Sequence, residues 1–385
     1  MDINQFSSVS PGKLVPIEGN DHAFIPLPLP PSWEFPNRLW PLLSDAKHKV
    51  GLLEGIGRYL PNPDILLVPA EKREALTSSR LEGTHLTVRE MLLFDIDPQQ
   101  SSRRDDSPGE NWREINNYRR AMRAGIASPL PLSLRLLRDM HAVLMEDVRG
   151  QDRAPGQFRQ IQVQIGRPSR FVPPPPRVLQ DCLSSLEKHL HVNKSTFDPL
   201  VDCFLAHYQF ETIHPFVDGN GRVGRLLLAL MLLKKCGLSR PWLYMSAYFE
   251  AHREEYVERL FNVSARNDWE GWVEFCLKAT IHQAEDTFQR CERLLMLEAT
   301  FKQKVEKAGG SVRLNRIIDH LFNSPFINVT EMAKYLDVSY PTAKTDIERL
   351  VQVKVLRELP DFSPKTYYAR GIFEIGYEDL SRGDE

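Results

Sequence analysis

The sequence predicts a mainly α-helical protein that carries one small β-hairpin and ends in a group of short helices and strands. Three observations support this fold class. Apolar residues recur three and four positions apart through most of the 385 residues, which is the period of a helix. One internal stretch, residues 160–166, alternates polar and apolar side chains in the manner of a strand. After a charged helix through about Lys307, the glycines at 309–310 make a break, and shorter elements follow.

The N-terminal region, residues 1–109, is expected to be helical after an extended proline-rich arm at 26–36. Helical patterns occupy 39–59 and 63–81. A capping-box sequence at 87–90, TVRE, predicts the start of a further short helix, because its first and last side chains can bond each other's backbone N–H.

A polar segment, residues 95–110, contains two prolines and paired serines and predicts a surface loop. The central region, 110–295, then carries apolar residues at helical spacing. Its first three predicted helices are 112–124, 131–148 and 178–193.

Composition excludes several classes of protein. The net charge of −2 gives no general attraction to nucleic acid or acidic membranes. No apolar run approaches the roughly 18 residues needed to cross a bilayer. The start, residues 1–5, lacks the basic and apolar parts of a signal peptide, so the expected compartment is the cytoplasm. Five widely spaced cysteines without a CxxC pair predict reduced thiols.

The most informative segment is 214–225, HPFVDGNGRVGR, which leads into the apolar run 226–233. That run predicts a buried helix, so the Gly-Asn-Gly turn at 219–221 lies at a helix N-terminus. Unpaired backbone N–H groups and the helix dipole make such a position suitable for an anion such as a phosphate.

The polar side chains of this segment suit phosphate chemistry. Arg222 and Arg225 lie three apart and offer fork-shaped donors to phosphate oxygens. Asp218 is a carboxylate beside the phosphates, where Mg²⁺ takes one or two protein oxygens. His214 can remove a proton from an attacking hydroxyl, since an ordinary imidazole has a pKa of about 6.5.

The segment resembles the Fic family motif HxFx(D/E)GNGRxxR. All specified positions match, and they are His214, Phe216, Asp218, Gly219, Asn220, Gly221, Arg222 and Arg225. The resemblance implies an all-helical core over roughly 110–288. It also implies transfer of AMP from ATP to a Ser, Thr or Tyr hydroxyl of a target protein, with release of pyrophosphate.

The residue roles follow from the same resemblance. It implies that His214 deprotonates the target hydroxyl and that Asp218 binds Mg²⁺. Asn220 and Gly221 are expected to hold phosphate oxygens, while the two motif arginines neutralise the charges of the β- and γ-phosphates.

A second short pattern lies upstream at 78–83, where SSRLEG fits the Fic inhibitory pattern [ST]xxxE[GN]. Taken alone, a Ser and a Glu four apart on a helix describe a solvated face. Beside the intact motif, the resemblance implies that Glu82 pairs with Arg225 and displaces the γ-phosphate. Glu82 is therefore expected to act as an inhibitory residue.

The alternating stretch 160–166 and the following 167–172 predict a hairpin, which ends at the prolines of 173–176. In Fic proteins a hairpin called the flap aligns the target segment by strand addition. Ile165 and Gly166 fall where the flap passes near the nucleotide. A purely structural hairpin is the alternative.

Tyr256 and Leu260 lie four apart on the predicted helix 254–263. The resemblance implies an adenine pocket in this region, and packing in the core is the alternative. Many family members have two consecutive tyrosines here, whereas this chain has Tyr256 followed by Val257. Only Tyr256 is therefore assigned to the nucleotide.

The C-terminal region, 296–385, resembles a winged helix-turn-helix domain behind a leading helix. Its helices are expected at 314–322, 330–336 and 340–352, and its two strands at 355–359 and 365–369. Nine Lys or Arg minus seven Asp or Glu give only +2 over 311–370. DNA binding and a protein-contact or homodimer role both stay open, because DNA-binding domains present a clearly basic face.

Three functions remain in consideration. The first is an AMP transferase that restrains itself and modifies a protein hydroxyl, including one of its own. The second is removal of AMP, or transfer of another phosphate-containing group, on the same frame. The third is a DNA-binding regulator whose helical core senses nucleotide.

Overall fold

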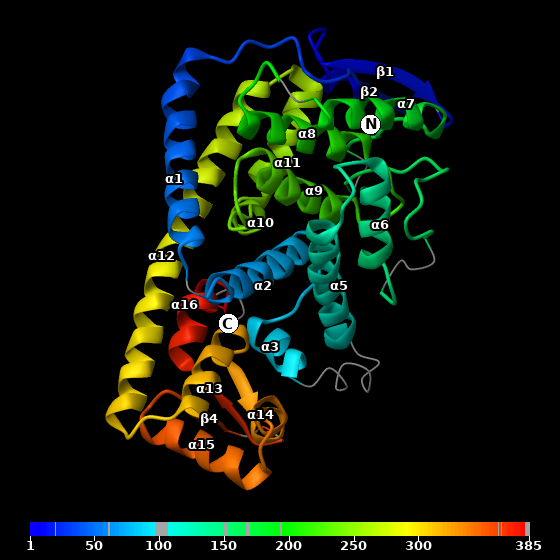
Figure 1. Cartoon of the computed structure of the whole chain (residues 1–385). Helices are drawn as coiled ribbons and strands as arrows, with labels where there is room; N and C mark the ends of the chain where they lie inside the picture. Colours follow the sequence, from blue (N-terminus) through cyan, green and yellow to red (C-terminus); the bar gives the residue numbers. More distant parts are fainter. Residues whose placement is uncertain are drawn as a thin grey trace. The chain divides into compact units, whose positions relative to one another are not determined.

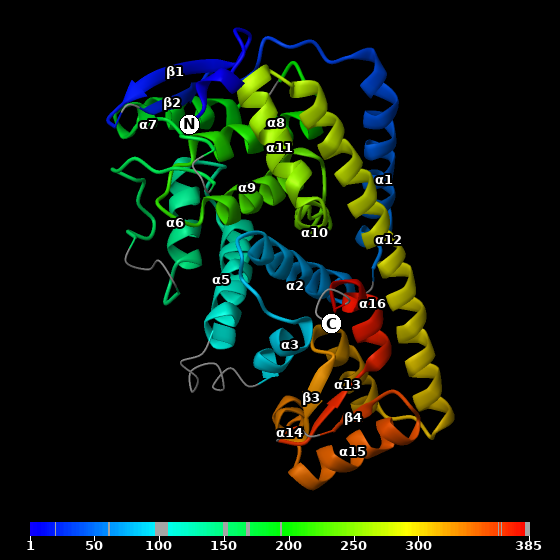
Figure 2. The same cartoon turned by 180° about the vertical axis from the view of Figure 1, so that it is seen from behind.

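Helices dominate the computed structural model, as the sequence predicts (Figures 1 and 2). The structure describes residues 1–19, 21–60, 62–96, 107–148, 153–166, 170–192, 195–360, 362 and 364–381. In this part of the chain no helix is both long enough and apolar enough to cross a membrane. The five cysteines are free thiols.

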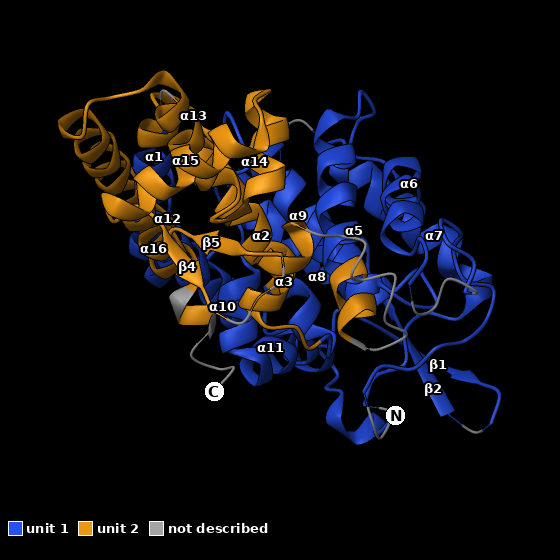
Figure 3. Cartoon of the chain, turned by 90° about the horizontal axis from the view of Figure 1, so that it is seen from below, with its two compact units in different colours: residues 1–54, 77–84, 114–284 blue, residues 55–76, 85–113, 285–385 orange. Residues whose placement is uncertain are grey.

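Two compact units make up the chain, and each gathers three separate segments (Figure 3). Unit 1 contains residues 1–54, 77–84 and 114–284, and unit 2 contains residues 55–76, 85–113 and 285–385. Four helices therefore run from one unit into the other: α1 (Trp40–Arg58), α2 (Asp64–Leu81), α5 (Ser107–Ala127) and α12 (Trp269–Lys307). The division of the sequence at 109 and 295 stays a prediction.

The centre of unit 1 is a pair of helices, α8 (Pro199–Ile213) and α9 (Asn220–Lys235). Most residues of both helices are buried, because apolar residues lie on all sides of each helix, with a few buried polar residues among them. The other helices of this unit are α6 (Leu134–Leu144), α7 (Pro176–Leu190), α10 (Ser246–Ala251) and α11 (Arg253–Arg266). The loop between α8 and α9 carries the motif, so two rigid buried helices fix its position.

An N-terminal hairpin in unit 1 was not predicted. Strands β1 (Gly12–Ile17) and β2 (Asp21–Pro26) pair in antiparallel fashion. The N–H of Phe24 also donates to the carbonyl of Val172 at 2.9 Å, and the Phe24 ring packs on Phe171. The hairpin therefore supports the C-terminal end of the predicted flap.

Unit 2 contains the predicted C-terminal helices α13 (Val312–Asn323), α14 (Val329–Leu336) and α15 (Tyr340–Gln352). The predicted strands are present as β4 (Arg357–Leu359) and β5 (Thr366–Tyr368). The sequence did not predict β3 (Phe326–Asn328) or α16 (Arg370–Ser381). The sheet has the antiparallel order β3-β5-β4. Its designation as a winged helix stays a prediction.

Helix α3 (Val88–Ile96), also in unit 2, starts at the predicted capping box. The Thr87 N–H donates to Glu90 Oε2 at 2.9 Å, and the Glu90 N–H donates to Thr87 Oγ1 at 3.1 Å. The surface loop predicted over 95–110 is wrong at both ends, where α3 continues to Ile96 and α5 begins at Ser107. The middle of that loop, 97–106, lies outside the described residues.

Candidate active site

The turn between α8 and α9 is closed by the side chain of Asn220. Its Oδ1 accepts the N–H of Phe216 at 2.8 Å, and its Nδ2 donates to the carbonyl of Phe216 at 2.9 Å. Gly219 precedes α9 in the left-handed conformation, with φ 75°, which glycine adopts without steric cost. The amide of Asn220 therefore holds the loop, and the backbone N–H groups of the first turn of α9 are what can face an anion.

His214 ends α8, also in the left-handed conformation, with φ 51° and ψ 62°. Its Nδ1 lies 3.3 Å from the backbone carbonyl of Glu211. A carbonyl oxygen can only accept, so Nδ1 carries the hydrogen and Nε2 keeps its lone pair. Burial lowers the pKa of His214 to about 4, which leaves a neutral imidazole able to take a proton at neutral pH.

Arg225 is buried and makes three hydrogen bonds to the end of α2, which belongs to the same unit. Its Nε donates to Ser78 Oγ at 2.8 Å, and its Nη2 donates to the Ser78 carbonyl at 2.8 Å and to Glu82 Oε1 at 2.7 Å. The side chain of Arg225 is only 3% exposed, whereas that of Glu82 is 38% exposed.

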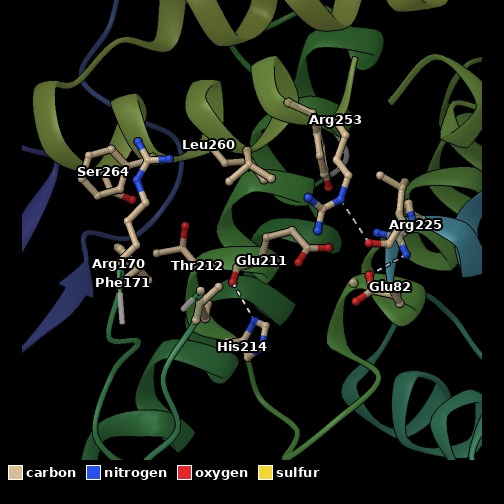
Figure 4. Close-up of a pocket in the computed structure, with 17 residues that line it drawn as sticks. Glu82, Arg170, Phe171, Glu211, Thr212, His214, Arg225, Arg253, Leu260 and Ser264 are labelled. Carbon is tan, nitrogen blue, oxygen red and sulfur yellow. Dashed lines mark hydrogen bonds and ion pairs between the residues drawn. The ribbon is translucent and has the colours of Figure 1, made fainter. Parts of the chain in front are cut away.

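Glu82 lies directly over the backbone of the anion-binding turn. A Cβ added at Gly221 would collide with Glu82 Oε1. Partial removal from water opposes ionisation of this carboxyl group, but the charge of Arg225 outweighs it and holds the pKa of Glu82 below its usual value. An ionised carboxylate thus occupies space beside both Gly221 and Arg225, and the close-up shows this pair at one side of the cavity (Figure 4).

The other motif arginine, Arg222, is buried below the turn. Its Nη1 lies 3.6 Å from Glu114 Oε2, and the Thr84 hydroxyl donates to the same Oε2 at 2.6 Å. The Nε and Nη1 atoms of Arg222 have no hydrogen-bond partner among the described residues. This arginine belongs to the motif but does not line the cavity described below.

Asp218 is the candidate metal ligand, and its side chain is 40% exposed. Its Oδ1 accepts the N–H of Gly219 at 2.7 Å, and its Oδ2 lies 3.5 Å from Arg153 Nη1. In the described part of the chain no three His, Cys, Asp or Glu residues gather into a metal site. A single accessible carboxylate fits Mg²⁺, because Mg²⁺ takes one or two protein oxygens together with phosphates and water.

A cavity of about 240 Å³ opens beside the turn (Figure 4). It brings together seven of the predicted site residues. These are Glu82, Ile165, Gly166, His214, Gly221, Arg225 and Tyr256. Four others are not on its wall, namely Asp218, Gly219, Asn220 and Arg222. Residues of the wall that were not assigned to the site include Leu81, Arg170, Phe171, Glu211, Thr212, Arg253, Val257, Leu260, Phe261 and Ser264.

One wall of the cavity is formed by successive turns of α11. Arg253, Leu260 and Ser264 line it at helical spacing, a periodicity that the sequence displays. Tyr256 also lines it, but its hydroxyl lies 2.9 Å from His207 Nε2, and His207 Nδ1 lies 3.1 Å from the Gly224 carbonyl. Tyr256 is therefore a core residue that also lines the cavity, and its assignment to the nucleotide stays a prediction.

The predicted flap is a single bridge rather than a two-stranded hairpin. Ile165 and Phe171 exchange backbone hydrogen bonds at 2.8 and 3.1 Å. The strand predicted over 160–166 is wrong, since only Ile165 pairs in this way. The prolines at 173–176 have no N–H to continue a ladder, and the Gln162 side chain donates to the Pro173 carbonyl at 2.9 Å instead. Residues 167–169 lie outside the described residues.

Comparison with known proteins identifies the family. The Fic/DOC family N-terminal model matches residues 40–127, and the Fic/DOC family model matches residues 131–232. The chain belongs to the Fic/DOC family. Its motif turn lies at the end of the matched segment, so the resemblance that the sequence predicted is confirmed.

Curated Fic relatives match a limited part of the chain. A probable protein adenylyltransferase of Aquifex aeolicus is 38% identical over 86 residues, which is 22% of this chain and 27% of that protein. Protein adenylyltransferase Fic of Drosophila melanogaster is 41% identical over 80 residues, which is 20% of this chain and 16% of that protein. The chain therefore aligns with about a quarter or less of the length of these relatives.

Solved structures share the fold at low sequence identity. A Fic family protein from Desulfovibrio desulfuricans G20 has a TM-score of 0.56 at 20% identity, covering 89% of this chain and 98% of that one. Residues 134–508 of Fic-1 from Caenorhabditis elegans have a TM-score of 0.51 at 21% identity, covering 66% and 76%. These likenesses support the mainly helical Fic fold.

Proposed function

We propose that this Fic protein transfers AMP from ATP to a Ser, Thr or Tyr hydroxyl of a target protein and releases pyrophosphate. The observation that carries the proposal is the neutral His214, which lines a cavity together with Gly221 and Arg225 and whose Nε2 has no hydrogen-bond partner among the described residues. A general base, an anion-binding turn and a buried cation are the groups that nucleotidyl transfer to an alcohol requires.

The reaction follows from these positions. Nε2 of His214 takes the hydroxyl proton as the target oxygen forms a bond to the α-phosphorus of ATP. The bond from that phosphorus to the bridging oxygen breaks, and pyrophosphate leaves with the electron pair. Backbone N–H groups at Gly221 stabilise the charge on the α-phosphate, and Arg225 holds the terminal phosphates. Asp218 would supply the protein oxygen for Mg²⁺, which would offset part of the phosphate charge.

In the resting state Glu82 restrains this reaction. Its carboxylate accepts a hydrogen bond from Nη2 of Arg225 and lies against Gly221. The γ-phosphate and Glu82 therefore compete for one guanidinium. ATP can still enter the open cavity, but not with its phosphates in line with the hydroxyl. Removal of Glu82 is therefore expected to raise the rate of transfer.

The proposal is tested with purified chain, ATP and Mg²⁺, using intact-protein mass spectrometry of the chain itself and of lysate proteins. We compare the parent, Glu82→Gly, and Glu82→Gly combined with His214→Ala. Adenylyl additions are expected to be most abundant with Glu82→Gly and to disappear in the double variant. Absence of any addition with Glu82→Gly, or equal addition without His214, would overturn the proposal. Loss of AMP from a previously modified target, instead of gain, would favour the reverse reaction.

The remaining expectations are part of the same proposal. The protein acts in the cytoplasm on partner proteins and on itself, and two copies can associate. Contact with DNA through α15 has little support from charge, since Lys344 lies 3.9 Å from Glu348 and Arg349 donates to the Ala308 carbonyl at 3.4 Å. A salt-sensitive shift of a DNA duplex in a gel would support DNA contact, and its absence at low salt would favour a protein partner.

A further inference from the structure

Glu211 is a carboxyl group at the cavity that the proposed reaction does not use. It lies on α8, three residues before His214, and its side chain lines the cavity. Its Oε1 is buried and has no hydrogen-bond partner among the described residues. A Cβ at Gly224 would collide with this oxygen, so glycine at that position of α9 makes the room for it. A buried polar oxygen without a partner is costly, which suggests that a ligand supplies one.

The helix α11 shows which part of a nucleotide would reach Glu211. At one end of the helix, Arg253 Nε donates to the carbonyl of Leu81 at 3.4 Å, close to Glu82 and Arg225. At the other end, Phe261 belongs to an apolar cluster with Phe171 of the flap. The residues from 253 to 264 span about 16 Å at 1.5 Å per residue. The cavity thus has a polar end that suits phosphates and a mainly apolar end that suits a purine. The Arg170 guanidinium lies over the Phe261 ring at this second end, 4.4 Å from the ring centroid.

Glu211 lies between these two ends. In the view of Figure 4, Glu211 and Thr212 separate the group around Ser264 and Phe171 from the group around Arg225 and Glu82. A nucleotide whose phosphates reach Gly221 and whose base reaches the apolar end places its sugar at this level.

We propose that Glu211 recognises the ribose of the bound nucleotide by hydrogen bonds with its vicinal 2′- and 3′-hydroxyl groups. This inference rests on the proposed function, since it requires ATP in the cavity. It makes Glu211 a specificity-determining residue, which selects ribonucleotides over nucleotides that lack these hydroxyls.

The protonation state of Glu211 suits this role. Burial raises its pKa to about 8, with Arg225 opposing the rise and Glu82 adding to it. At neutral pH the group is therefore mostly a neutral acid, which both donates and accepts. Each sugar hydroxyl also donates and accepts, so a carboxylic acid and a vicinal diol can satisfy each other. The alternative role, adjustment of the electrostatics of Arg225, would affect all triphosphates alike.

The test measures binding rather than turnover. In the combined Glu82→Gly and His214→Ala background, calorimetry compares ATP with 2′,3′-dideoxy-ATP in the presence of Mg²⁺. Two hydrogen bonds at about 0.5–1.5 kcal/mol each correspond to a preference for ATP of roughly fivefold to 150-fold. Glu211→Met has similar length but no hydrogen-bonding group, and it is expected to bind the two nucleotides equally. Glu211→Val repeats the comparison if methionine does not fit.

A matched control is Thr212→Val, which removes the neighbouring hydroxyl of the same wall and keeps its shape. The preference for ATP should survive this change. The proposal is overturned if Glu211→Met weakens the binding of both nucleotides by the same factor. It is also overturned if Thr212→Val alone abolishes the preference for ATP. If the Glu82→Gly and His214→Ala background does not bind ATP at all, the proposed function itself fails, which is a distinguishable result.

Discussion

Two regions of unit 1 meet at Arg225, and they are built in different ways. The turn 214–225 is held by contacts within itself, such as the two hydrogen bonds between Asn220 and Phe216. It is also held by Arg159, whose Nε donates to the His214 carbonyl at 2.8 Å, and by His141, whose Nε2 lies 3.0 Å from the Asp218 carbonyl. The end of α2 reaches Arg225 across 143 residues of sequence, and one guanidinium connects its Ser78 and Glu82 to the site. The first arrangement persists whatever α2 does. In the second arrangement another anion can replace the Glu82 carboxylate at the guanidinium, and an inhibitory contact has to be replaceable in this way.

The largest effect is expected when the shared guanidinium is removed. In the Glu82→Gly background, Arg225→Gln is expected to lower AMP transfer by about 100- to 1000-fold, because a preorganised cation that stabilises phosphate charge is lost. Initial rates with saturating ATP measure it. Arg240→Gln, at an exposed arginine beyond α9, is the control. A loss of only a few-fold would mean that Arg225 serves the inhibitory contact and not the phosphates.

A second test concerns the turn alone and uses pH. With a pKa of about 4, His214 stays unprotonated, and therefore active as a base, from pH 7 down to about 5.5. The value of kcat/KM for Glu82→Gly is expected to change less than twofold over this range. An ordinary histidine with a pKa of about 6.5 would lose roughly tenfold by pH 5.5. A decline with a midpoint near pH 6.5 would show that burial does not lower the pKa of His214.

The contrast between the two regions also explains how far the sequence could predict the site. The loop, the glycine at 219 and the helix that follows were predictable from residue type, because they depend on residues within the motif. The support that Arg159 and His141 give to the carbonyls of His214 and Asp218 was not predictable in this way. The contact of Glu82 with Arg225 was expected only through family resemblance. No local rule of helix formation pairs a residue of α2 with one of α9.

Elsewhere the failures have identifiable causes. The alternating stretch 160–166 suggests a strand, but its partner segment contains prolines that cannot donate to a ladder. The hairpin of β1 and β2 was missed because Pro16 interrupts its first strand. Glu211 was missed because α8 reads as an apolar helix, and the space that admits its carboxyl group depends on Gly224 of another helix. Such pairings become visible only when the helices are placed together.

A smaller effect is expected from Ser78→Ala, which weakens the α2 side of the comparison without changing the turn. The substitution removes the acceptor of Arg225 Nε, so the end of α2 is held less firmly and ATP competes better. AMP transfer by the otherwise unchanged chain is expected to rise about threefold to tenfold. Ser79→Ala is the matched control, because the Ser79 hydroxyl is buried and has no hydrogen-bond partner among the described residues. An equal rise in both variants would indicate general loosening of the helix.

The smallest expected effect is on stability. It distinguishes Glu211, which is protonated in the folded chain, from Glu82, which is ionised beside the same Arg225. The pKa of Glu211 rises on folding from 4.5 to about 8, so the folded chain binds a proton that the unfolded chain releases. The stabilisation from this proton is fully present below pH 4.5 and is lost progressively as pH rises to about 8. Glu211→Gln cannot lose a proton, so its unfolding temperature should gain on that of the parent over this interval.

For a chain of 385 residues, each kcal/mol of that gain corresponds to roughly 1 °C. The difference should grow between pH 5 and 8 and stay constant at higher pH, as measured by thermal unfolding without nucleotide. The exposed Glu254, changed to Gln, should show no such trend. A difference that is independent of pH would mean that the folded chain holds Glu211 ionised. In that case Arg225 would lie between two charged carboxylates, and the distinction between the replaceable Glu82 and the buried Glu211 would disappear.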